Sequence, residues 1–182
     1  MNTKDIVYIA LFAAVTAVLG LFPPITLPIT GVPVTAQSLG PMLAGAILGA
    51  RRGGLSILLF VVLVALGLPL FSGGRGGFGV LLGATGGFIV GWVISAFVIG
   101  LLIEKFWDRL NVINAALSIA VGGIVVLYAI GNLWVSIVVE ISYWKATVGA
   151  APFLIGDVIK VAIATAACMA VRRAYPLISR AR

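Results

Sequence analysis

The chain has 182 residues, of which 62% are hydrophobic and only 9% are charged, with a net charge of +7. So few charged residues cannot cover the surface of a soluble domain of this size, which excludes an ordinary soluble protein. The mean hydropathy of +1.25 and the 23 glycines are typical of an integral membrane protein whose helices pack closely.

Missing residue types argue against several classes of function. Histidine is absent and Cys168 is the single cysteine, so the commonest general base and the usual metal ligands are lacking. We therefore expect no catalytic residue, no metal site, no cofactor and no enzyme activity. Nucleic-acid binding is also disfavoured, because the basic residues form short clusters between apolar runs rather than one basic face.

Long apolar runs follow one another along the whole chain. A helix needs about 20 mostly apolar residues to cross a bilayer. We predict one all-α integral membrane domain over residues 1–182, with six transmembrane helices at roughly 5–22, 35–50, 53–69, 79–104, 112–139 and 150–171. A proline-rich loop follows the first run, rather than a small-residue cleavage site, so we expect that run to be a retained helix.

Two connections on one side of this predicted bundle have unusual compositions. The connection after the first helix contains four prolines, which restrict the backbone and predict an ordered cap over the helices. These are Pro23, Pro24, Pro28 and Pro33. The connection after the third helix reads SGGRGG at 72–77, where glycine permits close backbone approach or mobility.

The basic residues predict the orientation of the helices. Only Arg75 and Lys145 fall on the side away from the N-terminus, and Lys160 lies within a helix. By the positive-inside rule, both termini are then cytoplasmic. The residues on the N-terminal side are Lys4, Arg51, Arg52, Lys105, Arg109, Arg172, Arg173, Arg180 and Arg182.

Two charged residues lie inside the last apolar run. Asp157 and Lys160 are three residues apart, and so lie on one face of a helix that begins near Pro152. A charge in the bilayer core costs a few kcal/mol or more, so such residues face the protein interior or a wet cavity and are candidate functional groups. They could bind a polar ligand that both donates and accepts hydrogen bonds. The alternative interpretation is a structural ion pair.

Further polar residues are predicted at the same depth, in the outer half of the membrane. Gln37 opens the second helix beside Thr35 and Ser38, Asn132 and Tyr128 lie in the fifth, and Arg75 lies in the glycine-rich loop. Each alone fits a cap, a packing contact or a solvated charge. Together they predict an outward-facing pocket whose ligand-binding residues are Asp157, Lys160, Arg75, Gln37 and Asn132. Its aromatic walls would come from Phe71, Phe78, Trp134 and Phe153.

The sequence also bears on nucleotide binding and on partner docking. GRGGFG at 74–79 has the letters of a dinucleotide-binding fingerprint, but it joins two predicted membrane helices instead of following a strand, so we reject that function. No Walker A sequence is present, so the chain is not itself the ATPase of a pump. Ala10 and Ala14 form a small-residue stripe on the first helix, which packs internally or docks the helices of a partner.

Three segments resemble the signature segments of the BioY family, the biotin-specific substrate-binding S components of energy-coupling factor (ECF) transporters. They are PVTAQ (33–37), GLPLFSGGRGGFGVLLGATGGF (67–88) and PFLIGDVIK (152–160). The family commonly has Gly-Pro-Thr-Gly-Gly-Tyr where this chain reads GATGGF, with Ala84 and Phe88 at the variant positions. That difference weakens the case for a ligand role of residues 83–88.

The resemblance implies a six-helix S-component bundle in the plasma (inner) membrane of a prokaryote that captures biotin from outside. It implies that Asp157 and Lys160 lie at the end of the substrate pocket. It also implies partners, namely a transmembrane coupling (T) component and ABC-type ATPases, with Ala10 and Ala14 as the docking stripe. Arg75 would meet the biotin carboxylate, although the reverse pose is also compatible with the sequence.

Other functions remain alternatives at the level of sequence. The chain could be an S component for another vitamin, or an autonomous secondary transporter coupled to protons or sodium through Asp157. The sequence leaves open whether the chain works alone, as a homo-oligomer or only with an ATPase module.

Overall fold

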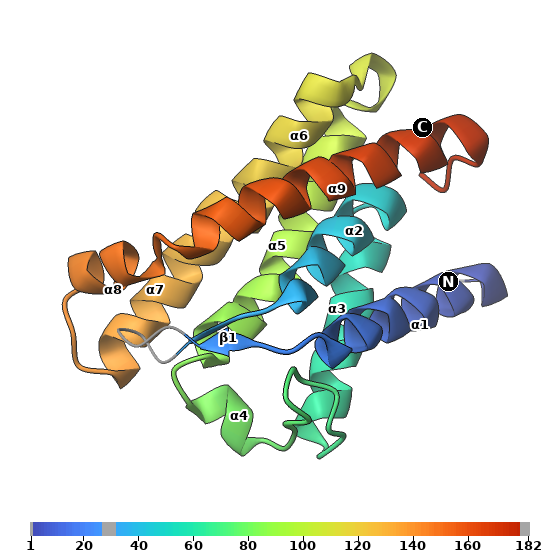
Figure 1. Ribbon diagram of the computed structural model, residues 1–182. Coiled ribbons are helices and arrows are strands. Elements are labelled where there is room, and N and C mark those ends of the chain that lie inside the picture. The colour runs from blue at the N-terminus through green and yellow to red at the C-terminus, as the bar shows by residue number, and fades with distance from the viewer. Residues whose placement is uncertain (1, 27–31, 179–182) are drawn as a thin grey trace.

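The computed structural model describes residues 2–26 and 32–178. Within them the chain is helical, apart from two short strands (Figure 1). In chain order the elements are α1 (Thr3–Val18), η1 (Leu19–Leu21), β1 (Ile25–Thr26), β2 (Pro33–Val34), η2 (Ala36–Ser38), α2 (Leu39–Leu48), α3 (Ala50–Ala65), α4 (Gly79–Leu82), α5 (Gly86–Lys105), η3 (Trp107–Arg109), α6 (Val112–Ala120), η4 (Val121–Val126), α7 (Leu127–Val138), α8 (Tyr143–Ala150) and α9 (Phe153–Ala174).

In the described part of the chain, four helical segments are long and apolar enough to cross a membrane. They are α1 with η1, α5, the continuous helix made by α6, η4 and α7, and α9. η2 with α2 forms a shorter apolar helix, and α3 has 16 residues. This is the all-helical membrane architecture that the composition predicts.

α2 lies at the centre of the bundle. It packs against α1, α3, α5 and α9, and Figure 1 shows it among them. Nearly all of its residues are buried. Gly45 allows the close approach to α5, since a Cβ there would lie 2.3 Å from the carbonyl oxygen of Ala96. Gly49, with a positive φ of 84°, makes the turn from α2 into α3.

The segment that the sequence predicts as one helix over 79–104 is divided in the structure. A single turn, α4, is followed by a break at residues 83–85 and then by α5. The indole Nε1 of Trp134 donates a 2.9 Å hydrogen bond to the carbonyl oxygen of Gly83 at this break. Gly86 has no room for a side chain, because a Cβ would lie 1.9 Å from the carbonyl oxygen of Leu81. The break therefore brings α5 close to α7.

Two connections between the helices are held by backbone pairing. β1 and β2 form an antiparallel pair in which Ile25 lies opposite Val34. Of the four prolines in the predicted cap, Pro28 lies outside the described residues. In the glycine-rich loop, Phe71 and Arg75 form an isolated antiparallel bridge. A helix that the sequence does not predict, α8, precedes α9 on the same side of the molecule (Figure 1).

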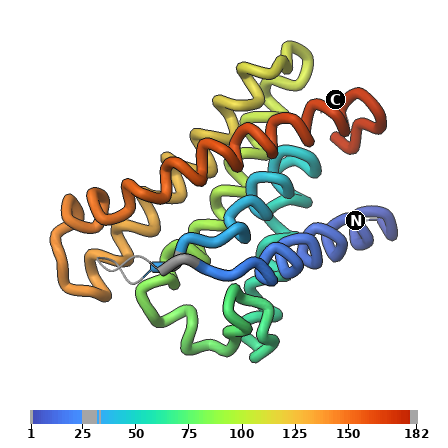
Figure 2. Tube along the Cα trace, in the orientation of Figure 1, coloured from blue at the N-terminus to red at the C-terminus, as the bar shows by residue number. Residues whose placement is uncertain are grey.

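Both described ends of the chain lie at one end of the bundle (Figure 2). There Arg52 of α3 forms a 2.8 Å ion pair with Asp5 of α1 and donates a 2.9 Å hydrogen bond to the carbonyl oxygen of Leu177. The segment after α9 is thereby held against α3. Arg180 and Arg182, which contribute to the predicted orientation, lie outside the described residues.

Candidate ligand-binding site

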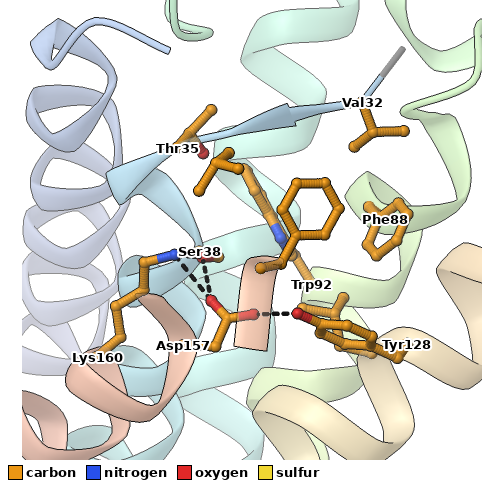
Figure 3. Close-up of a pocket in the computed structure, with 11 residues that line it drawn as sticks. Val32, Thr35, Ser38, Phe88, Trp92, Tyr128, Asp157 and Lys160 are labelled. Atoms are coloured by element: carbon orange, nitrogen blue, oxygen red, sulfur yellow. Dashed lines mark hydrogen bonds and ion pairs between the residues drawn. The ribbon is translucent and has the colours of Figure 1, made fainter. Parts of the chain in front are cut away.

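A cavity lies where the central helix η2–α2 meets α5, α7 and α9, beneath β2 (Figure 3). It has about 390 Å³ of empty space, part of which is open to solvent. Apolar and aromatic side chains form most of its wall, and a few polar groups converge at one place. The lining residues are Val32, Val34, Thr35, Ser38, Phe88, Trp92, Leu127, Tyr128, Phe153, Asp157 and Lys160.

The polar groups form one connected network around the Asp157 carboxylate (Figure 3). Lys160 Nζ lies 2.8 Å from Asp157 Oδ1 and donates a second hydrogen bond of 2.8 Å to Ser38 Oγ. The hydroxyl of Tyr128 donates to Asp157 Oδ2 at 2.6 Å. Both carboxylate oxygens therefore have donors, and the network joins α9, α7 and the end of η2.

The charged pair is almost entirely removed from solvent. The side chains of Lys160 and Asp157 are 13% and 6% exposed, respectively. Two opposite charges at hydrogen-bond distance compensate for much of the desolvation that either would suffer alone. One ammonium proton of Lys160 and further lone pairs of the Asp157 carboxylate stay available after these bonds. The pair can therefore present both a donor and an acceptor to an uncharged polar group.

Local structure explains how these side chains meet. Asp157 and Lys160 lie on one face of α9 because they are three residues apart. Tyr128 follows η4, a π-helical segment that contains one more residue per hydrogen-bonded turn than an α-helix. Gly122 and Gly123 within η4 approach Ile99 and Met42 too closely for a Cβ. The segment thus sets the rotation with which α7 presents Tyr128 to the cavity.

Aromatic rings form the apolar part of the wall. Phe88 meets Tyr128 and Phe153 edge-on, with centroid distances of 6.2 Å and 6.5 Å. Trp92 stacks on Phe71 at 5.4 Å. Edge-to-face and offset contacts of this kind hold rings in fixed orientations, so the cavity has a firm flat wall beside its charged end.

Gln37 does not line the cavity, and its amide makes three hydrogen bonds elsewhere. It is completely buried. Its Nε2 donates to the carbonyl oxygens of Thr16 and Leu70, at 3.1 Å and 2.9 Å, and its Oε1 accepts from the Ser72 amide at 2.9 Å. Gln37 therefore joins the end of α1 to the glycine-rich loop. This is a positioning role, in contrast to the ligand contact expected from sequence.

Asn132 and Arg75 also lie outside the cavity lining. Asn132 is buried one turn after Tyr128 and donates to Thr147 of α8 at 3.3 Å. The guanidinium of Arg75 donates to the Ser72 carbonyl oxygen at 3.2 Å and closes its own loop. Of the five ligand-binding residues predicted from sequence, the structure brings Asp157 and Lys160 together at the cavity.

The aromatic residues expected as walls occupy different places. Phe153 lines the cavity, whereas Phe71 lies behind Trp92. Phe78 is 62% exposed, and Trp134 holds the break before α5. Phe88 and Trp92 line the cavity although neither was predicted as a wall. Phe88 and Trp92 are four residues apart and so lie on one face of α5. Because the whole helix is apolar, its sequence does not reveal which face lines a cavity.

The small-residue stripe on the first helix is accessible. Ala10 and Ala14 are both exposed on α1, while Ala13 is buried against the bundle. Large apolar side chains surround the stripe, among them Val7 and Leu11, which are 58% and 51% exposed. This face of α1 is therefore free to contact lipid or another protein.

Comparisons with known proteins agree with the sequence resemblance. The model of the BioY family matches residues 1–177. The biotin transporter BioY of Rhizobium etli is 46% identical, over 98% of each chain. The biotin transporter BioY of Rhodobacter capsulatus is 44% identical, over 88% of each chain. A crystal structure of the S component for biotin from an ECF-type ABC transporter superposes with a TM-score of 0.92 at 27% identity, covering 97% of both chains.

Proposed function

The chain belongs to the BioY family, and on that premise we propose that it is the biotin-binding, substrate-capture subunit of a biotin uptake transporter. Biotin would enter from the side of the β1–β2 connection and bind in the cavity beneath it. The chain is then a transporter subunit of a prokaryotic plasma membrane rather than an enzyme.

The observation that carries this proposal is the buried Asp157–Lys160 pair at one end of an aromatic cavity. Biotin has a ureido ring with two N–H donors and one carbonyl acceptor, fused to an apolar thioether ring. Asp157 would accept a hydrogen bond from a ureido N–H group. The remaining N–H of Lys160 would donate a hydrogen bond to the ureido carbonyl. Phe88, Trp92 and Phe153 would enclose the ring system.

Biotin also ends in a carboxylate, for which the cavity lining offers no second cation. The ureido ring is therefore assigned to the charged pair, and the carboxylate to the mouth beneath β2. Thr35 lines the cavity there and has a hydroxyl that can donate to an anion. Arg75 is assigned no direct role, because it does not line the cavity and its Nε donates within its own loop.

In the membrane, the proposed arrangement has six crossings and cytoplasmic termini. η2 with α2 is roughly 20 Å long at 1.5 Å per residue, shorter than the hydrocarbon core of about 30 Å. It is nevertheless almost fully enclosed by neighbouring helices, so its ends need not meet lipid. The basic residues at the end of the bundle that carries both termini support the orientation.

The energy for uptake would come from partner subunits. The chain has no Walker A sequence, so a transmembrane coupling component and ABC-type ATPases are proposed as partners. The exposed stripe at Ala10 and Ala14 is the proposed contact with the coupling component, because small residues let helices approach closely.

Equilibrium binding to the purified protein in detergent tests the proposal. Biotin should bind, and thiamine and riboflavin should not compete with it. Lys160→Met should weaken biotin binding by tenfold or more, in line with the loss of a charged hydrogen bond. Lys145→Met, which changes an exposed lysine on the same side, should leave binding unchanged. A folded protein that binds thiamine or riboflavin in place of biotin would contradict the proposed substrate.

A further inference from the structure

A second hollow lies at the opposite end of the molecule from the ligand cavity, beside the described chain ends. It has about 650 Å³ of empty space between the starts of α1 and α3 and the end of α5. Its wall contains both acidic and basic side chains. The lining residues are Asp5, Ile9, Leu48, Arg51, Arg52, Leu55, Glu104, Leu177 and Ile178.

The two carboxylates of this hollow are already engaged. Asp5 pairs with Arg52 at 2.8 Å. Glu104 Oε1 accepts from the Ala50 amide at 2.8 Å, at the positive N-terminal end of α3. Gly49 leaves room for this oxygen, because a Cβ at residue 49 would lie 2.2 Å from it. Across the described residues, the guanidinium of Arg51 makes no hydrogen bond or ion pair. Arg51 is therefore the cation left for an external anion.

Two apolar grooves lead away from this hollow along the two sides of α3. One lies between α1 and α3 and is lined only by Ile9, Leu55, Leu58, Leu59 and Val62. The other lies between α3 and α5 and begins at Arg51 itself. Its remaining lining residues are Gly54, Leu55, Leu58, Val93, Ile94 and Phe97. Leu55 borders the hollow and both grooves, so the three spaces meet at one point.

The extent of these spaces along α3 argues for a lipid. The groove between α3 and α5 runs along α3 from Arg51 to Leu58, and the groove between α1 and α3 runs from Leu55 to Val62, roughly 10 Å each at 1.5 Å per residue. Together with the hollow they extend from Arg51 to Val62, roughly 16 Å. One leaflet of the hydrocarbon core is about half of 30 Å thick. A helix of a partner protein that crosses the membrane would need a groove about twice as long. A two-chain lipid of one leaflet fits, with its phosphate at Arg51 and one acyl chain on either side of the Leu55–Leu58 ridge.

We propose that the hollow at Arg51 and the two grooves beside α3 form a binding site for an anionic phospholipid of the leaflet at that end of the bundle. Arg51 binds the phosphate, and Leu58, which is 44% exposed and borders both grooves, separates the acyl chains. The bound lipid fills the space between α1, α3 and α5 next to the Asp5–Arg52 pair. It thereby fixes the position of α1.

Native mass spectrometry of the purified protein with added phosphatidylglycerol or phosphatidylcholine of identical acyl chains tests this site. A single basic residue near a membrane surface contributes an attraction of about fivefold for an anionic lipid. We expect phosphatidylglycerol to be retained about fivefold more than phosphatidylcholine. Arg51→Gln should abolish this preference, whereas Arg109→Gln, a charge loss on the same side outside the hollow, should preserve it.

A second pair of variants tests the grooves. Ile94→Trp fills the groove between α3 and α5 and should reduce the retention of both lipids. Leu101→Trp, on the same helix with similar exposure but outside the groove, should not. Equal retention of the two lipids would overturn the proposal, as would an equal loss for both arginine variants. If Arg51→Gln and Ile94→Trp left lipid retention intact but prevented capture of the coupling component, the surface would be a protein interface and the proposal would be wrong.

Discussion

The Tyr128 hydroxyl donates a 2.6 Å hydrogen bond to Oδ2 of Asp157, the carboxylate whose Oδ1 lies 2.8 Å from Lys160 Nζ. The carboxylate thus accepts from Tyr128 of α7 and from Lys160 of its own helix, and Ser38 Oγ lies 3.5 Å from Oδ1. Because a hydrogen bond to a charged acceptor is about twice as strong as a neutral one, Tyr128 determines which lone pairs of Asp157 face the cavity.

Removal of the Tyr128 hydroxyl should therefore weaken biotin binding without unfolding the protein. A hydrogen bond to a charged group contributes about 1.5–3 kcal/mol, so Tyr128→Phe should lower the affinity about tenfold or more. Isothermal titration calorimetry in detergent measures this change. Tyr143→Phe, which alters an exposed tyrosine, should have no effect. Unchanged affinity in Tyr128→Phe would show that the carboxylate needs no support from α7.

Loss of the Gln37 amide should act mainly on stability. Gln37→Ala leaves three buried backbone groups without their partner, namely the oxygens of Thr16 and Leu70 and the amide of Ser72. Each unsatisfied group costs about 1–3 kcal/mol, so the thermal midpoint should fall by several degrees. The Ser72 amide should also exchange faster with deuterium. Asn132→Ala removes one 3.3 Å bond and should lower the midpoint less. A larger fall of the midpoint in Asn132→Ala than in Gln37→Ala would refute the positioning role assigned to Gln37.

The close crossing of α5 and α7 should tolerate no side chain at Gly87. A Cβ there would lie 2.0 Å from Cβ of Trp134, and overpacking of this kind costs about 1–3 kcal/mol or more. Gly87→Ala should lower the thermal midpoint and change the tryptophan fluorescence. Gly79→Ala is the matched control, since nothing lies within 4 Å of a Cβ at that position. Equal midpoints for the two variants would contradict the observed crossing.

A bulky side chain on the exposed stripe of α1 should reduce biotin uptake without affecting biotin binding. Ala14→Trp is expected to leave biotin binding unchanged, because Ala14 lies on α1 outside the ligand cavity. It should reduce copurification of the coupling component and biotin uptake by cells at least severalfold, because the helices could no longer approach closely. Ile137→Trp, on an exposed face of α7, is the control. Normal uptake in the Ala14 variant would argue for another docking surface.

The sequence predicts the features that depend on composition and local spacing. The membrane class follows from hydropathy, and the shared face of Asp157 and Lys160 follows from their separation on one helix. The resemblance to the BioY family is confirmed by the family match. The break at residues 83–85 was not predicted, because small residues such as Gly83 and Ala84 are also common inside continuous membrane helices. Trp134, which holds the break, lies far along the chain.

The roles of individual polar residues were harder to predict, because they depend on long-range contacts. Gln37 binds residues 21 to 35 positions away, and no local pattern reveals that its amide is fully used. Tyr128 follows the π-helical segment η4, which shifts the helical register by a residue. A prediction based on 3.6 residues per turn therefore places Tyr128 on the wrong face of the helix. The contacts of Gln37 and of Tyr128 can therefore be identified only in the folded structure.

The binding of biotin amide tests whether Asp157 recognises the ureido ring of biotin. This analogue keeps the ureido ring but lacks the negative charge. We predict that it binds the unaltered protein within about tenfold of biotin, and that Asp157→Asn weakens both ligands about equally, by tenfold to a hundredfold, as expected for loss of a charged hydrogen bond. A large loss of affinity for the amide alone, with no effect of Asp157→Asn, would place the carboxylate at Lys160 and contradict the account.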